Sequence, residues 1–173
     1  MASSTDGPSP TMSDDELLCA FEDTSLPQTE WTHRAHVRVA FVYLSRFALQ
    51  EAIERMRAGI QAYNAAHDVS DGPLMGYHET TTQAFLRLID HAMCKRGPFR
   101  DARAFCEGNP ELLDRRVLLC YYTRERIIAP AAKTGFVEPD LAPLDRLGLQ
   151  YRPPQDTLSD AGSAERAETP EGA

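Results

Sequence analysis

The stretch TEWTHRAHVRVAFVYL, residues 29–44, places two histidines just ahead of a long apolar run. From Thr32 onward the apolar residues recur at three- and four-residue intervals, which is the spacing of an amphipathic helix. They are Val37, Ala40, Phe41, Leu44 and Phe47. With Thr32 as N-cap, His33 and His36 fall in the first turn of this helix. They share the face that a bundle would bury, so both imidazoles should point inward or line a pocket.

Helix signals continue on both sides of this stretch. Ser13 and Glu16 form a capping-box pattern, which predicts a short helix to about residue 23. Residues 49–69 predict a second long helix, because they place apolar side chains on one stripe and charges on the other. That stripe is Ile53, Met56, Ile60 and Tyr63. The turn residues SDGPLMG (70–76) end this helix.

The second half of the chain predicts three further helices. One covers about residues 78–94 and stops before a Gly-Pro pair, because proline disfavours helix in the residue before it. A short helix covers residues 101–108. The third begins at Pro110, where a missing amide is harmless, and runs to about residue 128. The chain then becomes irregular, and GFVEPDLAPL (135–144) predicts an extended strap over the bundle.

These signals define an all-α fold class, a compact bundle of five or six helices with disordered N- and C-terminal tails. The 173 residues, 42% hydrophobic and 25% charged, suit one ordinary domain. We expect a disordered leader at residues 1–12, a single helical domain at 13–150 and a disordered polar tail at 151–173, rich in Ser, Ala, Glu and Pro.

Charge and hydropathy narrow the classes of partner. The net charge of -8 argues against nucleic-acid binding, which depends on clustered Lys and Arg. No apolar run approaches the roughly 18 residues of a membrane helix, and residues 1–10 lack the pattern of a signal peptide. Four scattered cysteines without a C-x-x-C pair suit a reducing compartment. We therefore expect a cytoplasmic protein that binds neither nucleic acid nor a membrane, and its oligomeric state stays open.

A second histidine motif, GYHETTTQAF, covers residues 76–85. On a helix beginning here, His78 shares a stripe with Thr82, Phe85 and Ile89 and is directed toward the core. Glu79 is turned by about 100° from His78, which puts it at the rim of the buried face. Glu79 could reach a site beside His78, or it could simply place a negative charge at the favourable end of the helix dipole.

Three histidines and a carboxylate together could hold a divalent metal ion, Zn²⁺ or Fe²⁺. The predicted ligands are His33, His36 and His78, with Glu79 as a fourth ligand or a general base. The H-x-x-H pair lacks the spacing of the H-E-x-x-H metalloprotease motif. Two alternatives remain open. One is a metal-free acid-base pocket. The other is a structural core in which Trp31 stacks on His36 and His33 bonds a carbonyl.

Further polar and aromatic residues are candidates for contact with a small-molecule substrate. In CYYTRERI (120–127), the Tyr121 hydroxyl could bond a substrate, and the Arg124 guanidinium could bind a substrate carboxylate through two parallel hydrogen bonds. Ordinary packing of the tyrosine and an Arg-Glu ion pair would also explain these residues. The other candidates are Trp31, Tyr77 and Thr82. The chain has no G-x-G-x-x-G, P-loop or G-x-S-x-G motif. The function hypotheses are thus a metal-dependent enzyme or metal-binding helical protein, and a non-catalytic binding or scaffold domain.

Four segments taken together resemble a family of small, mostly bacterial helical proteins that is described as uncharacterised. They are WTHRAHVRVAFVYL, YHETTTQAF, YYTRERI and GFVEPDLAPL, and the likeness covers about residues 26–147 in the same order. The family pattern is W/F-T-H-x-x-H followed by Y-H-E-T-x-T. The resemblance implies that these motifs belong to one module and marks His33, His36, His78 and Glu79 as its polar signature. It implies no particular reaction, substrate or cofactor.

Overall fold

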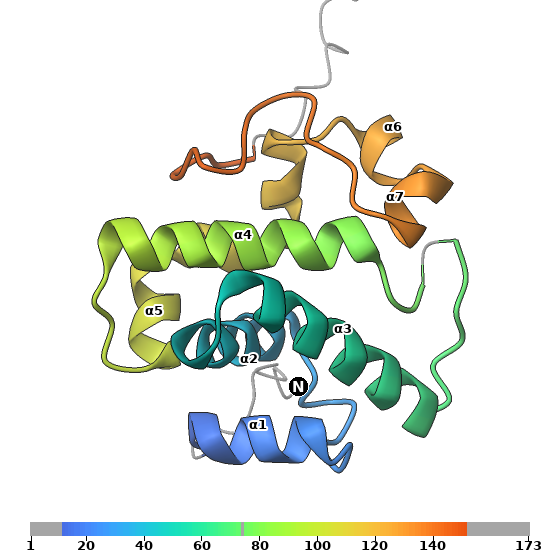
Figure 1. The fold of residues 1–173 in the computed structure, drawn as a ribbon, viewed down its shortest axis with the longest axis vertical. Coiled ribbons are helices and arrows are strands. Elements are labelled where there is room, and N and C mark those ends of the chain that lie inside the picture. Colours follow the sequence, from blue (N-terminus) through green and yellow to red (C-terminus); the bar gives the residue numbers. More distant parts are fainter. Residues whose placement is uncertain (1–11, 74, 152–173) are drawn as a thin grey trace, which may run out of the picture.

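The structure, a computed structural model, describes residues 12–73 and 75–151, which form helices joined by loops (Figure 1). The first five are α1 (Asp14–Glu22), α2 (His33–Arg46), α3 (Leu49–Ala66), α4 (Glu79–Arg96) and α5 (Ala102–Gly108). Within the described ranges no strand forms, and one isolated bridge joins Gly72 to Met75. The predicted all-α bundle is confirmed. The predicted leader and tail fall outside these ranges, apart from Met12 and Tyr151.

Helix α2 is the central helix of the bundle. Its N-cap is Thr32, whose side-chain oxygen accepts a hydrogen bond from the Ala35 amide at 3.3 Å. The helix contacts α1, α3, α4 and α5. Because neighbours cover most of its circumference, it buries more than the predicted apolar stripe. Its buried residues are Ala35, Val37, Arg38, Val39, Ala40, Phe41, Val42 and Tyr43.

Helices α3 and α4 pack against each other and against α2. The predicted stripe of α3 is confirmed, since Ile53, Met56, Ile60 and Tyr63 are all buried. The N-cap of α4 is His78, and the helix ends where Gly97 precedes a proline. None of the described helices is long and apolar enough to cross a membrane.

The predicted continuous helix over residues 110–128 is wrong. The segment instead forms two 3₁₀ helices, η1 (Pro110–Leu113) and η2 (Arg115–Cys120), and a short α6 (Arg124–Ile127). Asp114 has an extended backbone, and its carboxylate accepts from the Arg116 amide at 2.9 Å. Thr123 caps α6 in the same way. Such side chains offer the backbone an alternative to helical hydrogen bonds, and two of them divide this segment.

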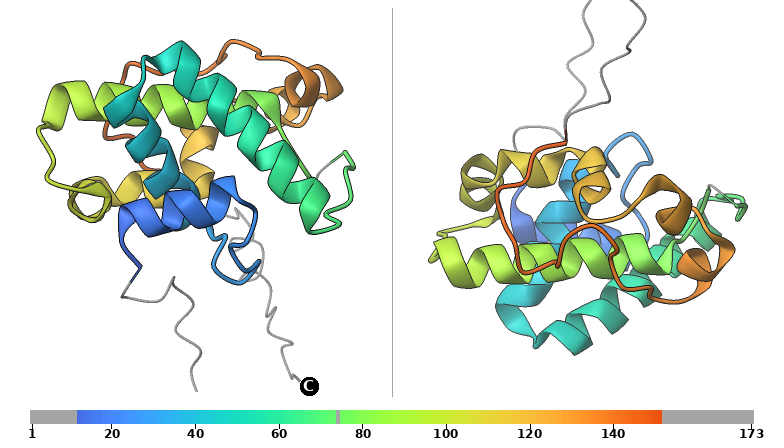
Figure 2. Two further views of the ribbon diagram at one scale, coloured as in Figure 1. Left: turned by 60° about the horizontal axis from the view of Figure 1, so that its bottom comes forward. Right: turned by 90° about the horizontal axis from the view of Figure 1, so that it is seen from above.

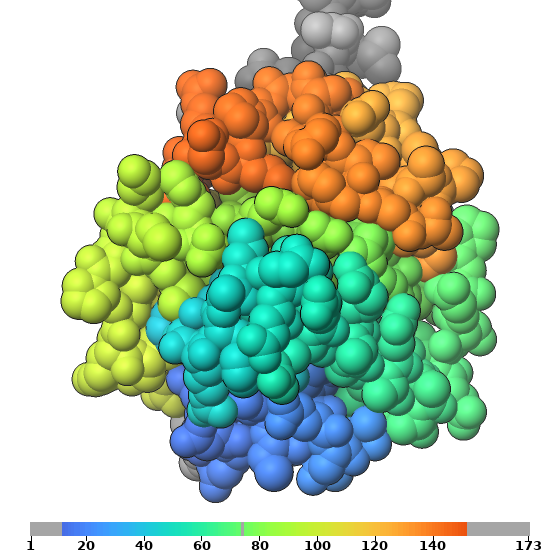
Figure 3. Space-filling model, in the orientation of Figure 1, coloured from blue at the N-terminus to red at the C-terminus, as the bar shows by residue number. Residues whose placement is uncertain are grey.

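The predicted strap over residues 135–144 is present and lies along α4, as both views of Figure 2 show. The Leu141 amide donates to the Tyr121 carbonyl at 2.9 Å, and the Val137 amide donates to the Thr80 hydroxyl of α4 at 3.1 Å. The chain just before the strap was predicted as irregular but forms the short helix α7 (Pro130–Thr134). Figure 3 shows these C-terminal segments packed directly against α4.

Candidate functional site

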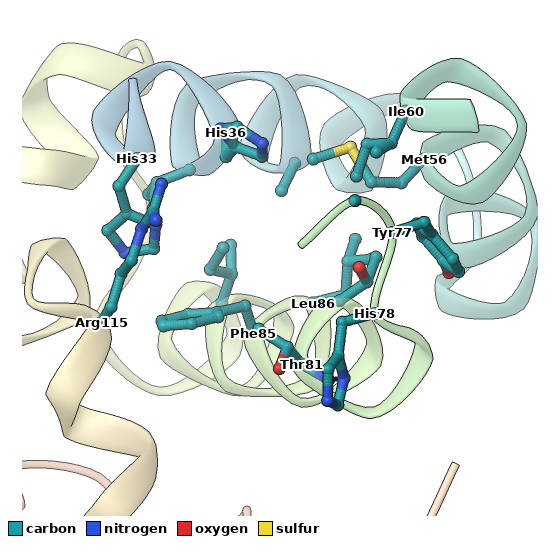
Figure 4. A pocket seen from close by; sticks show the side chains of 15 residues that line it. His33, His36, Met56, Ile60, Tyr77, His78, Thr81, Phe85, Leu86 and Arg115 are labelled. Atoms are coloured by element: carbon teal, nitrogen blue, oxygen red, sulfur yellow. Dashed lines mark hydrogen bonds between the residues drawn. The ribbon is translucent and has the colours of Figure 1, made fainter. Parts of the chain in front are cut away.

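A cavity of about 210 Å³ lies between α2, α3 and α4 (Figure 4). Its walls are largely apolar and come from all three helices: Val37, Ala40, Met56, Ile60, Phe85, Leu86 and Ile89. Polar side chains stand at its two ends. One end carries His33, His36 and Arg115, and the other carries Tyr77, His78 and Thr81. We call this space the cavity. The bundle therefore brings all three predicted histidines to one space.

His33 and His36 each use one ring nitrogen to bond a backbone carbonyl. His33 Nε2 lies 3.0 Å from the Leu112 oxygen, and His36 Nδ1 lies 2.8 Å from the Thr32 oxygen. A nitrogen that faces a carbonyl must carry the proton, so His33 Nδ1 and His36 Nε2 are left as acceptors. The His36 ring also stacks on Trp31, with 3.7 Å between centroids. This geometry matches the structural alternative predicted for both histidines.

Both imidazoles are neutral at physiological pH. Burial is the main cause and lowers the pKa of His33 and of His36 from 6.5 to about 4. The nearby Arg115 guanidinium lowers both pKa values further, because it repels a second positive charge. At pH 7 this end of the cavity thus carries one positive charge, from Arg115, beside two uncharged rings.

His78 stands at the opposite end of the cavity from His33, as Figure 4 shows. Its Nδ1 accepts a hydrogen bond from the Thr81 amide at 3.2 Å and caps α4. Its Nε2 lies 3.1 Å from the Ile127 carbonyl oxygen. Burial lowers the pKa of His78, so its ring is also neutral. Both ring nitrogens are occupied, and neither is free to bind a metal ion.

This arrangement does not fit the predicted metal centre. Among residues 12–73 and 75–151, no group of three or more His, Cys, Asp or Glu side chains could hold a metal ion. His78 would have to release both α4 and Ile127 to offer a lone pair. The three-histidine centre therefore stays a prediction that this conformation does not support.

Glu79 was predicted at the rim of the buried face, but its side chain is buried and does not line the cavity. It lines a neighbouring hollow with Arg57 and Lys133. Its two oxygens accept hydrogen bonds from Arg57 Nε and Nη2, from Gln83 Nε2 and from the Tyr77 hydroxyl. Led by the Arg57 bonds, these contacts lower the pKa of Glu79 from 4.5 to about 2. Such a carboxylate does not suit a general base at neutral pH.

The predicted substrate contacts Tyr77, Thr82 and Trp31 lie at or beside the cavity. Tyr77 lines it and donates its hydroxyl hydrogen bond to Glu79 at 2.9 Å. Thr82 lines the cavity as well. Trp31 lines a second space of about 290 Å³, which we call the side hollow. The cavity and the side hollow share four lining residues, His36, Ile60, Gly76 and Arg115.

Tyr121 and Arg124 are not part of this site, which corrects the prediction that they contact the substrate there. Tyr121 is buried elsewhere and donates to the Arg146 carbonyl at 2.6 Å. Arg124 lies on α6 and is exposed. Both were predicted on a long helix running along the bundle. The breaks at Asp114 and Thr123 instead direct them toward the strap and the surface.

Arg115 is the site residue that the sequence did not reveal. It opens η2, is exposed, and lines both the cavity and the side hollow. Its guanidinium makes no hydrogen bond or ion pair with the part of the chain that the structure describes. Arg116, by contrast, pairs with Asp114 at 2.8 Å. Only the helix break at Asp114 brings Arg115 here, and that break was not predicted.

Comparisons with family models, curated proteins and solved structures found no match to this chain. The family resemblance of the four motif segments therefore stays a prediction.

Proposed function

We propose that this protein is a helical domain that binds a small organic molecule in the cavity between α2, α3 and α4. The cavity itself carries the proposal. An engineered apolar cavity of about 150 Å³ binds benzene, so about 210 Å³ is room for a ligand built around one ring or a short chain. Apolar walls with a few polar groups at fixed points are the usual composition of ligand sites.

The polar groups support binding rather than acid-base chemistry. His33 and His36 have pKa values of about 4, and a base so weak is poorly matched to proton transfer at pH 7. His78 is occupied as a helix cap, and Glu79 is held by Arg57. His33 Nδ1 and His36 Nε2 are suited to accept hydrogen bonds from a ligand. We therefore favour the non-catalytic alternative for the histidine pocket.

We place the protein in the cytoplasm. The support is its cysteine chemistry: all four thiols are free, and Cys19 and Cys94 are exposed. Exposed unpaired thiols are typical of proteins in reducing compartments.

Filling the cavity with a larger side chain should weaken ligand binding. We expect a neutral ring compound such as phenylacetamide to raise the melting temperature of the wild type, because a ligand that binds only the folded state stabilises it by RT ln(1 + [L]/Kd). Ala40 is buried in the cavity wall, so Ala40→Leu should weaken binding by about tenfold or more. Differential scanning fluorimetry at increasing ligand concentration measures both effects.

The matched control is Ala58→Leu, which adds the same atoms to an exposed position of α3. It should leave the ligand-induced shift unchanged. Thr82→Phe fills the cavity from the α4 side and checks the result independently. The proposal fails if ring-sized compounds produce no shift in the wild type, or if both cavity-filling variants, folded by circular dichroism, respond as the wild type does.

A metal-dependent protein is the second candidate, because His33 Nδ1 and His36 Nε2 make no hydrogen bond with the described chain. We expect equimolar Zn²⁺, or Fe²⁺ under anaerobic conditions, to leave the melting temperature unchanged to within about a degree. A saturable increase that is absent from His33→Ala and His36→Ala would favour the metal hypothesis over the one proposed here.

A further inference from the structure

Building on the proposed ligand site, we propose that the ligand is a carboxylate with an apolar ring or chain, and that Arg115 binds its carboxylate at the mouth of the cavity. The proposal rests on the position of Arg115, on the charges around the cavity and on the shape of the guanidinium group.

Arg115 lies where the cavity meets the side hollow, since it lines both. Figure 4 shows its side chain extending from the 3₁₀ segment along His33 toward α2. From there the apolar wall formed by Phe85, Leu86 and Ile89 continues into the bundle. A molecule with its charged end at Arg115 would thus bury its apolar end among these side chains.

The charges around the two spaces favour an anion. The chain has 26 Asp and Glu against 18 Lys and Arg, a net charge of -8. Yet among the described residues that line the cavity and the side hollow there is Arg115 and no Asp or Glu. Asp114, the neighbouring acid, is already paired with Arg116. A cationic ligand would meet only repulsion here, whereas an anion gains an unpaired partner.

The shape of the Arg115 guanidinium indicates which anionic group the ligand carries. A guanidinium presents parallel N–H donors that match the two oxygens of a carboxylate. Arg115 is the only cationic lining residue among those described for the two spaces, because His33, His36 and His78 are neutral. One positive charge balances a carboxylate, whereas a phosphate dianion would keep an uncompensated charge against apolar walls. A monocarboxylate therefore fits the site best.

Two nearly isosteric probes test this proposal, phenylacetate and its uncharged analogue phenylacetamide. We expect isothermal titration calorimetry to show that the wild type binds phenylacetate about tenfold more tightly than phenylacetamide, the difference typical of a charge-assisted hydrogen bond. Arg115→Gln should reduce this preference to about onefold while phenylacetamide still binds. Arg124→Gln is the matched control, since it removes an exposed positive charge that lines neither the cavity nor the side hollow, and it should keep the preference.

The outcomes separate the two proposals. Equal binding of the two probes by the wild type, or an undiminished preference in Arg115→Gln, would overturn the carboxylate assignment and leave the proposed ligand site standing. Loss of the preference in Arg124→Gln as well would show a general charge effect and would also overturn the carboxylate assignment. If neither probe binds the wild type, both proposals fail.

Discussion

Acidification from pH 7 to pH 4.5 should lower the free energy of unfolding by about 2–3 kcal/mol for each of His33 and His36. Burial lowers the pKa of both rings from 6.5 to about 4. Between pH 6.5 and pH 4 the imidazoles are protonated in the unfolded chain but stay neutral in the folded chain. The stability that the two neutral rings contribute is therefore fully present above pH 6.5 and declines as the pH falls toward 4. Urea unfolding at several pH values from 7 to 4.5 measures the slope.

The control for this slope is the pair of variants His33→Gln and His36→Gln. Whatever their stability at pH 7, each should lose the part of the pH dependence that its own ring contributes, while the other ring and His78, whose pKa burial also lowers, keep theirs. Glu79 adds little to the pH dependence of stability between pH 7 and pH 4.5. Its pKa is lowered from 4.5 to about 2, so the stability that its carboxylate contributes declines mainly below pH 4.5. A wild-type stability that is constant from pH 7 to pH 4.5 would show that these imidazoles are not buried in neutral form.

Glu79→Gln should cost about 2–3 kcal/mol of folding stability, although it preserves the shape of the side chain. The Glu79 carboxylate is nearly buried and accepts four hydrogen bonds, two of them from Arg57. In glutamine an NH2 group replaces one of the two accepting oxygens, so a hydrogen-bond donor would face the donors of Arg57, Gln83 or Tyr77. Arg57 would also lose its ion pair. Guanidinium-chloride unfolding at pH 7 gives the difference.

The matched control is Glu51→Gln, which breaks another Glu-Arg pair on α3. That pair, with Arg55, is roughly half exposed on both sides, so its loss should cost no more than about 0.5 kcal/mol. If the two variants differ from the wild type by the same small amount, Glu79 does not anchor α4 to α3. The acid-base alternative for Glu79 would then regain support.

The sequence predicted those features that depend on neighbouring residues. The Ser13 capping box, the Thr32 cap and the buried stripe of α3 arise within a few positions of the chain, and the structure confirms each of them. The stack of Trp31 on His36 was predicted in the same way, from the staple geometry of a helix start. Patterns of this kind were enough to define the helices and the faces that they bury.

The features of the site that the sequence did not predict depend on contacts between segments that are distant along the chain. The carbonyls that bond His33 and His78 belong to Leu112 and Ile127, 79 and 49 positions further along the chain. Arg57, which neutralises Glu79, precedes it by 22 positions. The helix break at Asp114 was hidden because Asn109 and Pro110 are typical of a helix start. Residue type and spacing alone therefore predicted metal ligands without revealing the hydrogen bonds that the same histidines make to backbone carbonyls, and the metal centre stays a prediction.

The measurement that tests the ligand site most directly is a phenylacetate titration of isotopically labelled protein, followed by the ring resonances of His36 and Phe85 and the methyl resonances of Ile89. All three side chains line the cavity. We predict saturable shifts at these groups, and almost none at exposed Met75 or Leu141. Absence of shifts in the cavity at saturating phenylacetate, or shifts confined to the surface, would contradict the proposed function.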